Sequence, residues 1–456
     1  MPGSPGGTRQ PRPPTRTGPP DGRSRHPPLL ATHRSLTAEP RSRCPCRPGN
    51  APGGPDETHL RPKTSLKGVP AMLQPRHPQA AGESRLRGVD AARGLALIGM
   101  VATHIYPAVG DDGAVTPAHL LAAGRASAAF AVLAGVALAL STGRLPAPQA
   151  RASTVARAVC IGTIGLALGY THSGIAVILC YYALMFILAV PLLRAPVAAL
   201  VVVTVLAFAV VPAAGLLSRD HLPPPTLADP TFGRAFTHPV NLTLEMGFTG
   251  FYPALAWLGY LCVGLAVGRL DLRSTRVAAA LLAGGGTIAA AASLVSWALL
   301  RHAAGMAALE SVDPVEVAGV GPLPVRSILD AGLYGSTPTN TWWWLAVDTP
   351  HSSTPVDLLH TGAAAVALLG FVLLLSRLLP PLMLIPLVAV GSMTLTLYCT
   401  HVIVMSASFL PADPTPSFLL QAAVALTVAT AWRASGARGP AEAIVAAATR
   451  GTRQLV

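Results

Sequence analysis

Long apolar stretches recur along the chain from about residue 88 almost to its end. Each is close to 20 residues long, which is the length that an α-helix needs to cross the hydrocarbon core of a bilayer. Helices are favoured over a β-barrel because a helix satisfies every backbone group within its own segment. We therefore predict an all-α polytopic membrane protein with about ten transmembrane helices in a bundle. The predicted spans are 88–109, 117–141, 153–171, 174–193, 196–217, 246–268, 277–300, 355–379, 382–409 and 416–433. The break at 171–174 is slight, so a count of nine stays open.

The first 84 residues have a different composition. They are rich in Pro, Gly and Arg and hold no apolar run from which a core could be built, so we predict a disordered tail. Met72 precedes a short basic leader and is an alternative start of the chain. The transmembrane domain is then expected at 85–436, followed by a short cytoplasmic tail at 437–456.

Composition and charge support a membrane location. Only 12% of the 456 residues are charged, which is about half of the usual fraction in soluble domains. The net charge of +13 does not indicate nucleic-acid binding, because residues 1–84 carry 13 basic and five acidic side chains and the other arginines lie mostly in short loops. With ten spans these loops fall on one face, so the positive-inside rule predicts that both termini are cytoplasmic. We expect a multi-pass protein of a bacterial plasma membrane.

Motifs exclude several kinds of site. The cysteines include no CxxC pair, so no metal or redox site is expected. The sequence has neither a GxxxxGK[ST] phosphate loop nor a GxSxG nucleophile elbow, which argues against an ATP-driven pump and a serine hydrolase.

Charged residues inside the predicted spans need a partner or a purpose, because each costs about 2.5–3.5 kcal/mol on insertion scales. Asp90 and Arg93 are three residues apart at the start of the first span, where they share a helix face and are expected to form a structural ion pair. Arg125 lies among small residues in the second span. Two interpretations stay open for Arg125: burial opposite a carboxylate, and bidentate binding of an anionic group of a ligand.

Histidines gather at one end of the predicted spans. With the orientation above, these histidines fall in the outer half of the membrane or just outside it, together with two carboxylates, and predict a polar cavity that opens outward. The residues are His104, His119, His172, His351, His360, His401, Glu245 and Asp357. A histidine can act there as the general base that activates an amine or hydroxyl. Each histidine alone is equally compatible with an interfacial or hydrogen-bonded role, and helical spacing does not show whether the groups converge.

Two long outer loops are expected at 218–245 and 301–354. The second contains three consecutive tryptophans at 342–344, which argues against disorder. They are expected either in an interfacial aromatic belt or in the wall of a substrate pocket.

The segment RLRGVDAARGLALIGMVATHIYP resembles the opening of the heparan-alpha-glucosaminide N-acetyltransferase catalytic-domain family, and GRASAAFAVLAGVALALSTG is similar to the second span of its bacterial relatives. Later segments, among them THSGIAVILCYYALMFILAVPLL, HSSTPVDLLHTGAAAVALLG, GSMTLTLYCTHVIV and RGPAEAIVAAAT, resemble the related YeiB-like membrane proteins. The resemblance implies acetyl transfer from cytoplasmic acetyl-CoA to an amino sugar on the outer side, with a histidine in the first outer loop at its centre. In this chain that loop, PAVGDDGAVTP, has no histidine, and His104 and His119 flank it.

The first functional hypothesis is therefore a membrane acyltransferase that uses acetyl-CoA as co-substrate, needs no metal and acetylates an envelope sugar or amine. His104 is the candidate general base or transient acyl acceptor, and Glu245 and Asp357 are expected to orient histidines. The candidate catalytic residues are His104, His119 and Asp357, and the candidate substrate-binding residues are Arg125, Glu245, His351, His360 and His401. The alternatives are a transporter or exporter with an outward polar cavity, and an inactive relative. The expected partners are membrane lipid and a small-molecule or glycan acceptor, without nucleic acid, and a homodimer is compatible with the sequence.

Overall fold

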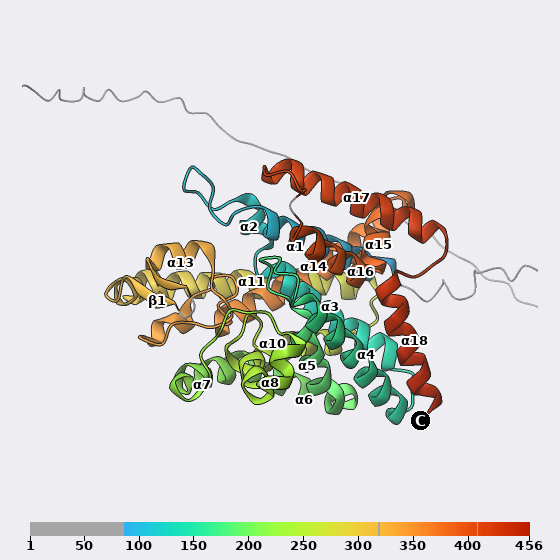
Figure 1. Cartoon of the computed structure of the whole chain (residues 1–456), viewed down its shortest axis with the longest axis horizontal. Coiled ribbons are helices and arrows are strands. Elements are labelled where there is room, and N and C mark those ends of the chain that lie inside the picture. Colours follow the sequence, from blue (N-terminus) through green and yellow to red (C-terminus); the bar gives the residue numbers. More distant parts are fainter. Residues whose placement is uncertain (1–85, 318–319, 408) are drawn as a thin grey trace, which may run out of the picture. The chain divides into compact units, whose positions relative to one another are not determined.

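The computed structural model describes residues 86–317, 320–407 and 409–456, which form helices except for loops and one short β-hairpin (Figure 1). The all-helical fold is as the sequence predicts. The tail expected at 1–84 and the alternative start at Met72 lie outside the described residues.

The α-helices are α1 (Arg87–Ile105), α2 (Pro117–Ala122), α3 (Arg125–Thr142), α4 (Ala147–Leu168), α5 (Leu179–Ala189), α6 (Val197–Val205), α7 (Val211–Leu217), α8 (Phe232–Thr237), α9 (Pro239–Leu244), α10 (Ala254–Val267), α11 (Thr275–His302), α12 (Gly305–Glu310), α13 (Val325–Ala331), α14 (Pro355–Leu378), α15 (Pro381–Ser392), α16 (Thr394–Met405), α17 (Pro414–Ala434) and α18 (Pro440–Gln454). Short 3-10 or π turns are η2 (Val190–Arg194), η3 (Leu206–Val210), η4 (Arg219–His221), η5 (Glu245–Thr249) and η6 (Trp342–Ala346). The hairpin pairs β1 (Val315–Val317) with β2 (Gly321–Leu323) in antiparallel register.

Several helices are long and apolar enough to cross a bilayer. In the described part of the chain, six helices meet this test, and two bent helix pairs raise the number to eight if each pair is one span. The six are Pro117–Thr142, Ala147–Leu168, Val197–Leu217, Thr275–His302, Pro355–Leu378 and Pro414–Ala434. Helices also occupy the two remaining predicted spans, as α1 and as the short apolar segment Leu179–Arg194. The chain is thus a multi-pass membrane protein.

Two predicted spans are broken helices. The last one before α17 bends by 71° between α15 and α16, where Pro386 lies inside α15 and Met393 leaves the helical conformation. The other bends by 58° between η5 and α10. Broken helices expose backbone groups that must find other partners at membrane depth, and at the start of α16 a side chain from the C-terminal helix provides them.

Helices approach one another closely at glycines. A side chain on Gly264 of α10 would collide with the Val132 carbonyl of α3, and one on Gly391 of α15 would collide with the Asp90 carbonyl of α1. Small residues allow such backbone contact, which is the common way for helices to associate in membranes. The helices α1, α3, α10, α14 and α15 therefore form a tight bundle that fixes the residues described below.

The tail expected at 437–456 contains a helix, α18, which packs along α4 and contacts α16 (Figure 1). Glu442 makes the connection. Its carboxylate accepts hydrogen bonds from the backbone amides of Leu395 (2.7 Å) and Thr396 (3.2 Å) and from the Thr396 hydroxyl (2.6 Å). An acidic side chain is favourable at the N-terminus of a helix, so Glu442 serves as the cap of α16.

The long loop after α11 folds around a core of its own. Trp344 is fully buried in this core, and its indole N–H donates to the Asn340 side chain at 2.9 Å. Trp343 packs on Gly305, and Trp342 is exposed. Trp344 therefore stabilises the loop, a role that neither the aromatic-belt nor the pocket-wall interpretation contains.

Candidate functional site

Three of the predicted histidines converge on one cavity of about 250 Å³. His104 comes from the last turn of α1, His119 from α2 and His351 from the loop before α14. Tyr252 and Tyr398 also line the cavity, which we call the histidine cavity. Its described lining contains no carboxylate and no cationic Lys or Arg side chain.

Local sequence explains how these histidines meet. Thr116 caps α2 by accepting a hydrogen bond from the His119 amide, and Pro117 follows in the first turn. Gly124 then adopts φ +69°, which favours glycine and turns the chain into α3 beside Pro350 and His351. His351 itself has φ +58°, an uncommon conformation for a residue with a side chain and one that is concentrated at functional sites.

His104 belongs to a chain of three side chains. Its Nδ1 lies 3.0 Å from Nε2 of His401, and the two rings are parallel within 6° with centroids 5.3 Å apart. Nδ1 of His401 lies 2.7 Å from Oε1 of Gln421. These hydrogen bonds leave Nε2 of His104 without a protein partner among the residues described, at the wall of the histidine cavity.

The other two histidines of the cavity also have few partners among the residues that the structure describes. The buried Nε2 of His119 has no hydrogen-bond partner in the described part of the chain. The rings of His351 and Tyr252 pack edge to face, with their centroids 5.8 Å apart. Burial, with a smaller contribution from the neighbouring His119, lowers the pKa of His351 to about 4. His351 is therefore neutral at physiological pH.

Arg125 and His360 bind each other away from this cavity. Nε of Arg125 donates to Nε2 of His360 at 3.0 Å, and another guanidinium N–H donates to the Leu120 carbonyl at 2.8 Å. Nδ1 of His360 in turn lies within 3.0 Å of the Ala289 carbonyl and 2.9 Å of the Ser293 hydroxyl. No described carboxylate lies at ion-pair distance from Arg125, and neither Arg125 nor His360 lines the histidine cavity.

The predicted carboxylates bind groups other than histidines. Glu245 forms an ion pair with Arg234 and accepts hydrogen bonds from the amide (3.0 Å) and hydroxyl (2.8 Å) of Thr226. Asp357 accepts from the Ser353 amide at 3.0 Å, and its other oxygen is buried without a partner in the described structure. Glu245 thus fixes the loop before α8. Asp357 fixes the turn that carries His351.

A second cavity, of about 360 Å³, contains the arginines Arg93 and Arg157. Arg93 forms an ion pair with Asp90 at 3.1 Å. Arg157 lies over the Phe186 ring at 6.0 Å, and within the described ranges no hydrogen bond or ion pair to it is present. We call this space the arginine cavity. Helix α18 forms one side of it through Glu442, Val445, Ala446 and Thr449.

Two features of the arginine cavity were not predicted from the sequence. Arg157 falls inside the predicted third span, 153–171, but was not singled out; α4 begins at Ala147 and carries Arg157 three turns into the helix. Arg453 of α18 lies near enough to interact electrostatically with Arg157, and its buried Nε has no partner in the part of the chain that the structure describes. The helical pattern after Gly439 could have indicated α18. No sequence signal places it against α4.

The two cavities share a wall. Met100, Ile178 and Tyr398 line both of them. The Tyr398 hydroxyl accepts a hydrogen bond from the Ile178 amide at 3.3 Å, and its own proton has no acceptor among the described groups. A single layer of side chains thus separates a cavity that contains Arg93, Arg157 and Glu442 from a cavity whose described lining has histidines but no Lys, Arg, Asp or Glu.

Residues 85–301 match the family model of the heparan-alpha-glucosaminide N-acetyltransferase catalytic domain. The match confirms the predicted resemblance over this part of the chain, which contains α1 to α10 and most of α11. It indicates a membrane acetyltransferase family. A search of curated proteins found no match to the chain.

Proposed function

We propose that the protein transfers an acetyl group through the bilayer, from a coenzyme A thioester in the arginine cavity to an amine or hydroxyl of an envelope acceptor in the histidine cavity. The observation that carries this proposal is the shared wall of Met100, Ile178 and Tyr398. Two separate cavities that meet at one layer of side chains suit a reaction whose substrates approach from opposite sides.

The arginine cavity fits the donor by charge. Arg157 has no carboxylate partner among the described residues, and Arg453 and Arg93 are close to it. Guanidinium groups bind phosphates in the bidentate manner that coenzyme A would require. In this proposal the arginine cavity opens to the cytoplasm, both termini are cytoplasmic and the chain crosses a bacterial plasma membrane ten times, in keeping with the positive-inside rule.

The histidine cavity fits the acceptor by chemistry. Nε2 of His104 would accept the proton of the acceptor amine or hydroxyl while the acceptor attacks the thioester carbonyl carbon. The carbon–sulfur bond then breaks, and the departing thiolate takes the proton back from His104. The products are the acetylated acceptor and free coenzyme A.

Tyr398 supplies the donor that the developing oxyanion needs. Its hydroxyl oxygen already accepts a hydrogen bond from the Ile178 amide, so its own proton is available at the wall where the two substrates meet. A fixed hydroxyl donor in a site that excludes water is the usual way to stabilise the negative charge of an acyl-transfer transition state.

The experiment uses the full chain in liposomes, with radiolabelled acetyl-CoA outside and inside and a panel of amino sugars, alkyl amines and sugar alcohols as acceptors. We expect label on an acceptor, and a saturable rise in melting temperature with acetyl-CoA. His104→Ala should abolish transfer and keep the thermal shift. His302→Ala is the matched control, because His302 is exposed and outside both cavities.

A transporter makes a different prediction. It would move an intact labelled compound across the liposome membrane without producing an acetylated acceptor. Unchanged transfer in His104→Ala, or transport without transfer by the intact protein, would overturn the proposal.

A further inference from the structure

We propose that Gln421 is a positioning residue that acts through His401 to hold His104 with Nδ1 protonated and Nε2 free toward the histidine cavity. The assigned role in catalysis rests on the proposed function, whereas the assigned protonation pattern does not. In this proposal His401 does not bind substrate; it orients the base His104.

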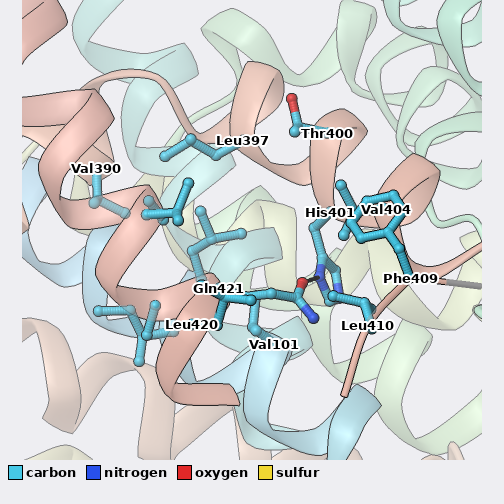
Figure 2. A pocket seen from close by; sticks show the side chains of 15 residues that line it. Val101, Val390, Leu397, Thr400, His401, Val404, Phe409, Leu410, Leu420 and Gln421 are labelled. Atoms are coloured by element: carbon cyan, nitrogen blue, oxygen red, sulfur yellow. Dashed lines mark hydrogen bonds between the residues drawn. The ribbon is translucent and has the colours of Figure 1, made fainter. Parts of the chain in front are cut away.

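The Gln421–His401 contact lies in an apolar pocket. Figure 2 shows the Gln421 side chain reaching from α17 to the His401 ring of α16, with Leu397, Val404 and Leu420 around them. The described lining residues include one other polar residue, Thr400, besides His401 and Gln421. Hydrocarbon rather than water is adjacent to such a surface in a bilayer, so His401 depends on the glutamine for the hydrogen bond at its Nδ1.

The orientation of the amide follows from its other neighbours. The Gln421 nitrogen lies 3.5 Å from the Ser417 hydroxyl and 3.7 Å from the Met405 sulfur, which both accept hydrogen bonds. A flipped amide would place its oxygen against the sulfur and leave the nitrogen against His401. The carbonyl oxygen therefore faces His401.

This orientation determines the protons on both rings. A carbonyl oxygen only accepts, so Nδ1 of His401 must be the protonated nitrogen, and Nε2 of the neutral ring must be the acceptor. Nδ1 of His104 lies 3.0 Å from that acceptor and must donate to it. The remaining lone pair of neutral His104 is then on Nε2, which is where the proposed reaction needs a base.

Gln421 is also the last member of this series of hydrogen bonds. An amide oxygen does not take up a proton at physiological pH, so a proton gained by His104 stays within the histidine pair and returns to the leaving thiolate through Nε2. The near-parallel rings and the amide dipole are placed to stabilise the positive charge of that intermediate state. No carboxylate takes part.

The charged and titratable groups that face His104 can each affect its titration in a pH test. They are His401 and Tyr398 from α16, His119 from α2, His351 from the loop before α14 and Tyr252 from the segment before α10. None of them is a carboxylate. A glutamate at position 421 would therefore place the first negative charge on this chain of hydrogen bonds.

The test uses Gln421→Glu, Gln421→Met and, as the matched control on the same helix, Thr430→Val. Gln421→Glu should move the acidic limb of the pH–rate profile upward by about one unit or more, because a nearby carboxylate favours a protonated histidine. Gln421→Met keeps the size of the side chain and removes the acceptor, so it should reduce turnover at least about tenfold. The donor-induced thermal shift should stay unchanged, and Thr430→Val should behave as the parent protein.

A second readout does not depend on catalysis. In protein with ¹⁵N-labelled histidine, the nitrogen spectrum should show His104 protonated at Nδ1 and not at Nε2, and Gln421→Met should mix the two tautomers. Protonation of His104 at Nε2 in the parent protein would overturn the inference even if the protein is an active transferase. If no acceptor is acetylated but the spectrum is as expected, the proposed function fails and the positioning role of Gln421 remains.

Discussion

Removal of the Glu442 carboxylate tests whether α18 is part of the donor site. The carboxylate accepts hydrogen bonds from the backbone amides of Leu395 and Thr396, the first groups of α16. In Glu442→Ala these amides lose their partner, which costs about 1 kcal/mol each because water can replace part of the contact at this half-exposed position. The loss at the two amides alone, about 2 kcal/mol, corresponds to a roughly 30-fold increase in the fraction of molecules with α18 detached.

Hydrogen exchange measured by mass spectrometry follows this detachment directly. Peptides from 440–454 and from the start of α16 should lose protection in Glu442→Ala, while α11 and α14 keep theirs. Acetyl-CoA should restore part of the protection and bind more weakly than to the parent protein, because α18 forms one side of the arginine cavity. Arg450→Ala, an exposed position on the same helix, is the control. Equal donor affinity in Glu442→Ala, with α18 shown to be detached, would refute the assignment of α18 to the donor site.

Three further predictions follow from the two cavities. Arg157→Ala should weaken acetyl-CoA binding about tenfold through loss of one charged hydrogen-bond donor, whereas Arg151→Ala on the exposed side of α4 should leave it unchanged; equal calorimetric affinities for both variants would contradict the donor assignment. Tyr398→Phe should reduce turnover about 100-fold without weakening donor binding, and normal turnover would remove Tyr398 from the chemistry. Because His351 is neutral when folded, with a pKa of about 4, the unfolded chain binds the proton first as the pH falls. Thermal stability should thus decrease from about pH 6.5 to pH 4, and His351→Gln should flatten that decrease.

Hydrophobic pattern alone was enough for the class of fold, because apolar runs of bilayer length have few alternatives to a helix. It also predicted that His104, His119 and His351 lie near one membrane face, and the structure joins these three in one cavity. Run length could not reveal the bends in the broken helices. A 71° change of direction between α15 and α16 depends on packing against α1 and on a cap from α18.

Which groups the polar side chains bind could not be predicted from the sequence. Spacing gives the depth of a residue along its helix but not the rotation of that helix about its axis, so His360 and His401 look equivalent in the sequence. In the structure one binds Arg125 and the other binds His104. Gln421 carries no charge and lies in a predicted span, and thus gave no signal that a histidine depends on it.

The two cavities differ in their charged lining residues, and in the proposed reaction only the acetyl group crosses the wall between them. Coenzyme A is a multiply charged anion, and its passage through a bilayer would require every charge to be compensated along the way. An acetyl group is small and neutral, so only the thioester end needs to reach the layer of Met100, Ile178 and Tyr398. Arg157, which has no ion-pair partner among the described residues, would retain the anionic carrier on one side, and the histidine cavity, whose described lining has no Lys or Arg, would offer it no countercharge. Such a separation favours transfer of a group over transport of a molecule, and it predicts that introducing a cation beside His104 would weaken catalysis by lowering the basicity of the histidine pair.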